Sequence, residues 1–315
     1  MKNKKMREII DFISQKKFSQ IPENAFFKIE PKEGNILFVD GGNAELISTP
    51  NFSLNFIRTA GVVFNGKEKT KTSVAEFYVL FYLERKEDKI IVNTKIIPVK
   101  GDLNLDEKEF IFYFMQQEFS FFSDIVRRIS EINLASQMAK SLGSKTLIVL
   151  DGTLEAKSEI EKSAIEKLRN FARVNAINLC ALSKTTSALS YNGESLAFLI
   201  LKSAPKERCY AQLADYENIK TFFLKLHPKS SYIFRCDLFP ETSSEIFSNL
   251  AFISNDAVFL GYPYGLIEAD KIARVSNREK EILRVEFAAR AGKKWADFEE
   301  MEKSLNAHKI LDSIL

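Results

Sequence analysis

Histidine is nearly absent from this sequence, and cysteine is rare. The 315 residues include only two histidines, His227 and His308, and three cysteines without CxxC spacing. Because zinc sites are built mainly from clustered histidine and cysteine ligands, we expect no zinc centre of this kind. Any metal ligands should instead be carboxylates, which suit Mg²⁺ or Mn²⁺.

A long apolar run and a strong excess of one charge are also missing. No 18-residue apolar stretch occurs, and the basic N-terminus lacks the apolar segment of a signal peptide. Three cysteines leave one unpaired in any disulfide scheme, which fits a reducing compartment. We therefore expect a cytoplasmic protein that does not enter a membrane. Since 45 Lys and Arg nearly balance 42 Asp and Glu, nucleic-acid binding would depend on local basic patches.

What is present reads as one mixed α/β domain. Lys5–Lys17 has apolar residues at helical spacing and predicts a short helix. The first third then continues as a β-meander, with strands predicted at Ile36–Val39, Asn55–Phe64, Ala75–Arg85 and Lys89–Val99. We expect the domain to span residues 1–315, with an N-terminal helical arm at 1–30, a core at 31–286 and a C-terminal helix at 287–315.

The middle of the chain predicts a long helix and then a βαβ unit. The helix extends from roughly Asp106 to Ser141, and the unit comprises strand Thr146–Leu150, helix Ser158–Val174 and strand Ile177–Leu182. Further strands are predicted at Arg208–Leu213, Thr221–Lys225 and Tyr232–Asp237. The last third is helical, at Ser243–Phe252, Tyr264–Arg274, Asn277–Ala291 and Trp295–Ile314.

Two similar phrases lie more than a hundred residues apart. ILFVDGGNAEL at 36–46 and LIVLDGTLEAK at 147–157 each end an apolar run on Asp-Gly. Asp-Gly is foremost a turn signal. A fully apolar run, however, is typical of a central strand, and open α/β sheets bind ligands beyond the carboxyl ends of their strands. We therefore predict that Asp40 and Asp151 meet in space and bind a metal ion.

Other candidate residues accompany these aspartates. Glu131 lies at the boundary of the apolar face of the helix before the second phrase, and Glu118 is a competing acid on the same stretch. In LGYPYGLIEADKIARVS, Tyr262 and Asp270 are eight residues apart, a spacing that places both on one face of a helix. Lys184 follows a buried strand in LCALSKTTSAL, where its charge could neutralise a phosphate. Taken alone, each is more often a packing or solvent-exposed residue.

Together these segments resemble the NurA nuclease family. The resemblance is carried, in the family's order, by FVDGG, RRISEINLA, LIVLDGTLEAK, LSKTT, YIFRCDL and GYPYGLIEADKIARVS. It implies an RNase H-like mixed β-sheet core flanked by helices, with helical N- and C-terminal additions. It also implies a Mn²⁺-dependent deoxyribonuclease with a two-ion site, for which Mg²⁺ is the other candidate metal. Family members have 5′→3′ exonuclease and single-strand endonuclease activities and act as homodimers beside a HerA-type hexameric translocase in DNA end resection.

The resemblance also implies roles for individual residues. Asp40, Glu131 and Asp151 match the metal-binding acids, and Tyr262 matches the active-site tyrosine. The best-known archaeal members have histidine where this chain has Asp270. An aspartate there can still bind the metal, but it cannot act as a neutral imidazole.

The chemistry explains why these residue types would be required. Two divalent ions about 3.5–4 Å apart can activate a water molecule and stabilise the leaving oxygen of a phosphodiester. Lys184 would offset the charge that develops on the phosphate. Beyond the site, contacts to DNA are predicted from three basic segments, Phe64–Lys71, Arg127-Arg128 and Arg290–Trp295.

Two other functions remain open at this point. An actin-like or sugar-kinase-type ATPase also places Asp-Gly-Gly loops after strands, but VDGGNAEL is not followed by Ser or Thr at phosphate-loop spacing. The 12 glycines include no second glycine-rich motif for adenosine. A catalytically silent DNA-binding subunit is the other alternative, and the aspartate at position 270 keeps it open. Metal-dependent DNA cleavage separates the nuclease from both.

Overall fold

The computed structural model describes residues 18–305, except 102, 104, 114–116 and 217, together with residues 5–7, 9, 10 and 12. Most of the predicted helix Lys5–Lys17 lies outside the described residues, and so does the end of the predicted helix Trp295–Ile314. Among the helices in the described part, none has the length and apolar character needed to cross a membrane.

One mixed sheet of eleven strands runs through the described part of the chain. The strands are β1 (Phe27–Lys28), β2 (Asn35–Ser48), β3 (Phe52–Asn65), β4 (Glu68–Lys86), β5 (Lys89–Lys100), β6 (Phe112–Tyr113), β7 (Leu147–Asp151), β8 (Asn178–Ser183), β9 (Cys209–Tyr216), β10 (Ile219–Lys225) and β11 (Phe234–Leu238). Their order is β1-β9-β10-β11-β8-β7-β2-β3-β4-β5-β6. β7 pairs in parallel with both β2 and β8, whereas β2, β3 and β4 are antiparallel. The central order β4-β3-β2-β7-β8 is the RNase H-like arrangement, which confirms the predicted fold class.

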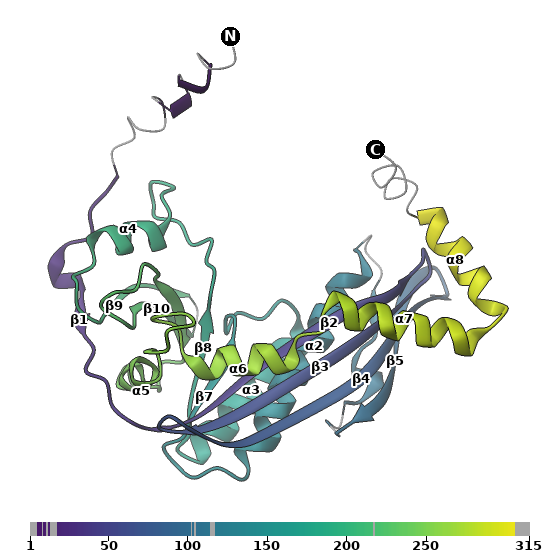
Figure 1. Cartoon of the computed structure of the whole chain (residues 1–315), viewed down its shortest axis with the longest axis horizontal. Helices are drawn as coiled ribbons and strands as arrows, with labels where there is room; N and C mark the ends of the chain where they lie inside the picture. Colours follow the sequence, from purple (N-terminus) through teal and green to yellow (C-terminus); the bar gives the residue numbers. More distant parts are fainter. Residues whose placement is uncertain are drawn as a thin grey trace.

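Helices cover both faces of the sheet. The helical elements are η1 (Glu23–Ala25), η2 (Glu107–Glu109), α2 (Phe119–Ala139), α3 (Glu159–Val174), α4 (Leu196–Ser203), α5 (Ile246–Phe252), α6 (Tyr264–Ala273), α7 (Asn277–Ala291) and α8 (Lys294–Leu305). In Figure 1, α6 and α7 cross the front of the long strands, while α2 and α3 lie behind them. The central strands are therefore buried on both sides, as their continuous apolar runs predict.

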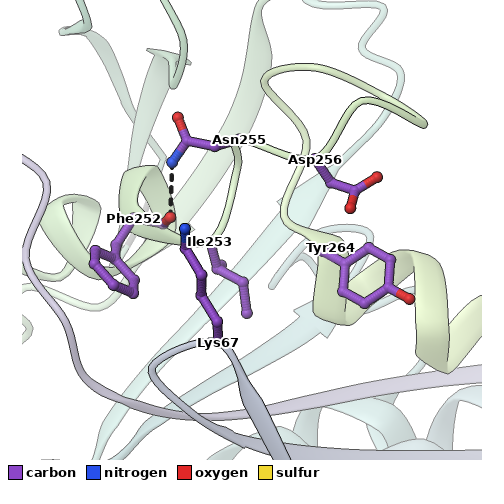
Figure 2. A pocket seen from close by; sticks show the side chains of 6 residues that line it. All are labelled: Lys67, Phe252, Ile253, Asn255, Asp256 and Tyr264. Carbon is purple, nitrogen blue, oxygen red and sulfur yellow. Dashed lines mark hydrogen bonds between the residues drawn. The ribbon is translucent and has the colours of Figure 1, made fainter.

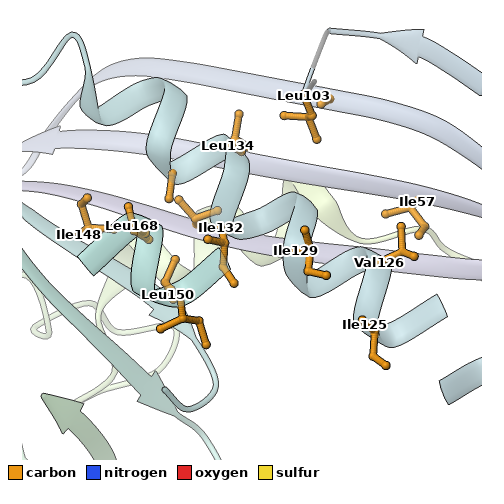
Figure 3. Close-up of a cluster of buried hydrophobic side chains, with 14 of the residues drawn as sticks. Ile57, Leu103, Ile125, Val126, Ile129, Ile132, Leu134, Ile148, Leu150 and Leu168 are labelled. Atoms are coloured by element: carbon orange, nitrogen blue, oxygen red, sulfur yellow. The ribbon is translucent and has the colours of Figure 1, made fainter. Parts of the chain in front are cut away.

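Strand β2 shows how one segment supplies both cores. Its residues alternate between faces, so that Leu37 and Val39 pack in the cluster under α2, whereas Ile36 and Phe38 pack in the cluster under α6. Figure 3 shows the first of these clusters, in which Ile125, Ile129 and Ile132 extend from α2. Their spacing of three and four residues gives α2 one continuous apolar face. Burial of each such side chain contributes about 1.5–3 kcal/mol.

The predicted helix Asp106–Ser141 is wrong in its first part. The helix begins only at Phe119, and the residues before it form η2 and β6. There, the carbonyl oxygen of Phe110 accepts a hydrogen bond from Thr94 Oγ1 (2.7 Å), and Glu107 Oε1 accepts one from the Ile96 backbone N–H (2.8 Å). The segment therefore covers the edge of β5, whose backbone groups would otherwise remain unpaired, and this tertiary requirement overrides the helical pattern.

Candidate active site

Asp40 lies within a strand and not at its end, which corrects the prediction that the strand stops there. β2 continues to Ser48, and Asp40 pairs with Ala60 of β3. What stops at this point is the parallel pairing with β7, whose last pair is Val39 with Leu150. Asp40 therefore lies at an edge of the sheet because its neighbouring strand ends, although its own strand does not.

The two glycines after Asp40 permit close packing and do not form a turn. A Cβ atom on Gly41 would lie 2.5 Å from Oε1 of Glu131 on α2. A Cβ atom on Gly42 would collide with the backbone carbonyl oxygen of Ala273 at the end of α6. The Gly-Gly pair thus allows helices on opposite faces of the sheet to approach β2 directly beside Asp40.

We expect Gly42→Ala to destabilise the protein by about 1–3 kcal/mol, because the added methyl group meets backbone atoms that cannot move alone. Chemical denaturation followed by circular dichroism would measure this change. Gly143→Ala is the matched control, since a Cβ atom at Gly143 meets nothing within 4 Å. Equal stability of the two variants would contradict the close approach of α6 to β2.

The structure brings Asp40 and Asp151 to the same face of the sheet, as predicted. Residues two apart on a strand point the same way, so Asp40 shares its face with Phe38, and Asp151 shares its face with Val149. Both apolar residues belong to the cluster under α6. Asp151 is the last residue of β7, next to the point where β2 loses its pairing with that strand. The two Asp-Gly phrases therefore converge on one place.

Three more predicted residues surround Asp151. The Tyr262 hydroxyl donates a hydrogen bond to Oδ1 of Asp151 (3.2 Å). Lys184 Nζ lies 3.6 Å from Oδ2 of Asp151 and 3.4 Å from Oδ1 of Asp270, and it stacks over the Tyr262 ring at 5.6 Å from the centroid. Asp270 also accepts a hydrogen bond from Arg274 (2.5 Å). Tyr262 and Asp270 therefore both lie beside one cluster, as predicted, but the predicted helical spacing is not the reason, because Tyr262 precedes α6, whose N-cap is Pro263.

Glu131 approaches from α2, on the other face of the sheet, and its side chain is fully buried. It lies against Gly41, and its charge raises the pKa of Asp40. Oε1 pairs with Arg127, and Oε2 accepts a hydrogen bond from Arg128 Nη1 (3.0 Å). The competing acid Glu118 is exposed immediately before the first turn of α2, about 20 Å along the helix from Glu131. The structure thus places Glu131 at the site and Glu118 away from it.

Burial and neighbouring negative charge make ionisation of Asp40 unfavourable. Desolvation is the largest cause, followed by the charges of Asp151 and Glu131, and together they raise the pKa of Asp40 to about 8. Lys184 and the backbone N–H of Gly41 oppose this shift in part. In the protein alone, the ionised form of Asp40 is therefore disfavoured mainly because the carboxyl group is buried.

Tyr262 and Lys184 both keep their protons at neutral pH. Burial and the charge of Asp151 raise the pKa of the Tyr262 hydroxyl well above its ordinary value. Burial alone would lower the pKa of Lys184, but the charges of Asp151, Asp40 and Asp270 outweigh it and raise that pKa. Tyr262 can therefore donate a hydrogen bond, and Lys184 carries a positive charge.

The donor chemistry at this place fits a hard divalent cation. Asp40 and Asp151 offer carboxylate oxygens, the ligands that Mg²⁺ and Mn²⁺ prefer. Burial, and then the charges of Asp151 and Glu131, raise the pKa of Asp40, and a bound cation would oppose that shift. Within the described residues, no group of three acidic, histidine or cysteine side chains is gathered closely enough to hold a metal ion. Glu131 is instead paired with Arg127 and Arg128, and Asp270 with Lys184 and Arg274.

Arg127 and Arg128, which the sequence predicts as contacts to DNA, both pair with the buried acid Glu131, and the Arg127 side chain remains one-quarter exposed. Arg128 is only 8% exposed and is fully engaged inside the protein, and Arg127 pairs with Glu131 and donates to the carbonyl oxygen of Gly41 (3.3 Å). The spacing of three and four residues to Glu131 is the ion-pair spacing of a helix, and it is the signal that could have revealed this role.

The other two basic segments lie away from the acids. Phe64–Lys71 forms the β3–β4 turn, at the end of β2 where Asn35 pairs with Asn65, five positions from Asp40. Arg290–Trp295 spans the junction of α7 and α8. The hydrogen bond and ion pairs that join Asp151, Tyr262, Lys184 and Asp270 involve no residue of either segment.

A cavity of about 320 Å³ opens near the β3–β4 turn. It is lined by Lys67, Phe252, Ile253, Asn255, Asp256 and Tyr264. Figure 2 shows Lys67 extending toward Phe252, with Asp256 and Tyr264 on the other side. Its lining includes none of the six predicted site residues, so this cavity is separate from the acidic cluster.

Two solved structures are similar to this chain, and the first of them supports the fold. The crystal structure of the NurA nuclease from Sulfolobus solfataricus aligns with a TM-score of 0.60 and 13% identity, over 93% of this chain and 95% of that one. The catalytic domain of human endonuclease V aligns with a TM-score of 0.43 and 10% identity, over 84% of this chain and 92% of that one. Comparison with curated protein sequences finds no match.

A family profile gives the assignment. The profile described as the NurA domain matches residues 34–275, which contain all six predicted site residues and the central strands of the sheet. The chain therefore belongs to the NurA family.

Proposed function

We propose that the protein is a metal-dependent deoxyribonuclease that hydrolyses phosphodiester bonds at the cluster formed by Asp40 and Asp151. The observation that carries this proposal is the convergence of two strand-borne carboxylates with a lysine and a tyrosine, Lys184 and Tyr262. Membership of the NurA family and the likeness to a structure named as a NurA nuclease support the same activity.

The proposed metal ligands are the two strand aspartates, with Glu131 and Asp270 as further ligands. When bound, divalent ions would supply the charge that activates water and stabilises the leaving oxygen. Mn²⁺ is the metal we propose, and Mg²⁺ shares the same ligand preference. The raised pKa of Asp40 supports this proposal, because a bound cation would stabilise the ionised carboxylate that burial and the neighbouring acids disfavour.

The chain's own residues have separate tasks in this proposal. Lys184 would hold a positive charge against the phosphate of the substrate while it also pairs with Asp151. Tyr262 remains protonated and orients Asp151 through its hydrogen bond. Protonation of the leaving group would fall to solvent, because neither His227 nor His308 lies in the motifs that form the cluster.

The biological setting that we propose follows the NurA family. The substrates would be single- and double-stranded DNA ends, cut with 5′→3′ exonuclease and single-strand endonuclease activities. The protein would act as a homodimer beside a HerA-type hexameric translocase in the resection of double-strand breaks, in the cytoplasm. The NurA domain supports DNA as the substrate. The activities, the dimer and the translocase partner are proposed from the resemblance to the family, and the cytoplasm is proposed from the three cysteines, which cannot all pair.

The test is cleavage of end-labelled linear DNA, single- and double-stranded, by the purified full chain with Mn²⁺, with Mg²⁺ and with EDTA. We expect products with a divalent ion and none with EDTA, because the carboxylates alone cannot stabilise the negative charge of the pentacoordinate transition state. ATP turnover is measured in parallel, and ATP hydrolysis without DNA cleavage would favour a kinase-like function. If no metal supports cleavage even after addition of a HerA-type partner, the protein is a silent subunit and the proposal is wrong.

A further inference from the structure

Arg128 is a buried arginine that contacts four different parts of the site's framework. Nη1 donates to Oε2 of Glu131 (3.0 Å) and to the backbone carbonyl oxygen of Asp151 (2.7 Å). Nη2 donates to the carbonyl oxygen of Thr153 (2.6 Å), and Nε lies 3.6 Å from Oε1 of Glu161. One guanidinium therefore joins α2, the end of β7, the loop after it and the first turn of α3.

Arg128 contacts the main chain directly at the end of β7, where pairing with the neighbouring strands stops. Asp151 is the last residue of β7, and its β8 pairing partner, Leu182, is the last in that register. Gly152 then turns with a φ of +96°, and the chain leaves the sheet. From this point, Arg128 binds the carbonyl groups on both sides of Gly152. The side chain and the carbonyl group of Asp151 are attached to the same Cα atom. The direction of the side chain therefore depends on the backbone conformation that Arg128 holds at this residue.

Arg128 also contacts Glu131, and so it positions this acid relative to the end of β7. Glu131 is fully buried and cannot be held by water, so its carboxylate position depends on Arg127 and Arg128. Since the same Nη1 atom of Arg128 donates to Glu131 and to the Asp151 carbonyl, it fixes the distance between the two residues. A planar guanidinium offers five N–H donors in a rigid arrangement, which a lysine ammonium does not reproduce.

We propose that Arg128 is a positioning residue for the metal site: it sets the geometry between Asp151 and Glu131, and thereby the affinity for divalent cations, without touching the metal ion or the DNA. This inference rests on the proposed function. Groups that orient metal ligands typically change metal affinity or activity by about 10–100-fold when they are replaced.

The experiment measures Mn²⁺ binding to the full chain by isothermal titration calorimetry, in wild type and in Arg128→Lys. The matched control is Arg169→Lys. Arg169 is also a multiply bonded arginine, since it donates to both carboxylate oxygens of Glu241 (2.7 and 2.9 Å) and stacks on Phe239 (4.2 Å). It lies on α3, and none of these partners belongs to the acidic cluster. Thermal unfolding of the metal-free proteins is recorded alongside.

We expect the Mn²⁺ Kd of Arg128→Lys to rise by about 10–100-fold, whereas the control keeps the wild-type Kd. A purely structural role would instead lower the Tm of Arg128→Lys and leave its Mn²⁺ affinity unchanged, and that result would overturn the inference. Wild-type protein that neither binds Mn²⁺ nor cleaves DNA would overturn the proposed function, and the role of Arg128 with it.

Should Arg128→Lys not fold, Glu161→Gln provides a second test. It removes the negative charge beside Arg128 Nε and keeps an oxygen that can still accept the hydrogen bond from the Lys157 backbone N–H (2.8 Å). The guanidinium then loses one of its four attachments while Arg128 itself remains. We expect a weaker Mn²⁺ affinity in a folded protein, and an unchanged affinity would contradict the positioning role.

Discussion

Asp151→Asn should reduce DNA cleavage by roughly a factor of 10³ or more and leave the fold intact. The carboxylate is one-quarter exposed, at the end of β7, and lies within 3.6 Å of both Tyr262 and Lys184. An asparagine keeps the shape and can still accept the Tyr262 hydrogen bond, but it loses the charge that a divalent cation requires. Asp40→Asn should have the same effect on cleavage, since it removes the other strand-borne carboxylate.

Initial rates on end-labelled DNA at saturating Mn²⁺ measure this loss, and circular dichroism verifies the fold. Glu118→Gln is the control, because this acid belongs to the same part of the sequence but is exposed at the start of α2. It should keep wild-type activity. Retained cleavage by either aspartate variant, with the contaminating nuclease background subtracted, would contradict the proposed site.

Asp40→Asn should make the metal-free protein more stable at pH 8, by roughly 5 °C in Tm. The pKa of Asp40 is about 8 in the folded protein, against an ordinary value of 3.8. Between these values the native state keeps a proton that the unfolded state releases, so the free energy of unfolding falls as the pH rises. The penalty is absent below the unfolded pKa and complete above the folded one. Removing the acid removes the penalty.

Thermal unfolding in EDTA, from pH 4 to pH 9, tests the sign of this effect. The Tm difference between variant and wild type should be small at pH 4 and largest above pH 8. Mn²⁺ should raise the Tm of wild type more than that of the variant, because a ligand stabilises only a state that binds it. If the Tm difference between the two proteins did not change with pH, the ionisation of Asp40 would not destabilise the folded protein, and the prediction would be wrong.

The sequence correctly predicts that Asp40 and Asp151 come together, but it does not predict the backbone conformation at Asp40. The apolar runs before Asp40 and Asp151 correctly indicate central strands, and the structure contains both the predicted meander and the predicted βαβ unit. The RNase H-like class is implied by the resemblance to the NurA family and not by these patterns. The same pattern wrongly ends β2 at Asp40, because Asp-Gly-Gly reads locally as a turn. Only the approach of α2 and α6 from opposite faces explains why glycines stand there inside a strand.

The segment before α2 and the arginines on it could not be placed from local patterns alone. Residues 106–113 carry helix-compatible composition, yet they cover the edge of β5, which depends on a partner that is distant in sequence. Arg127 and Arg128 read as a basic surface pair, although both turn toward Glu131. Helix α4, Leu196–Ser203, was not predicted because its eight residues offer little more than two turns of periodicity.

The two aspartates differ in how they tolerate changes in chain length. Asp40 belongs to a strand that remains paired with β3 on both sides of it, so an insertion in the turn at 49–51 would leave its position unchanged. Asp151 stands where its strand ends, and the chain beyond it is held through the Arg128 contacts to residues 151 and 153. Insertions at 152–157 would therefore act on this aspartate directly. Natural length variation in the family should accumulate at the first turn and be rare at the second.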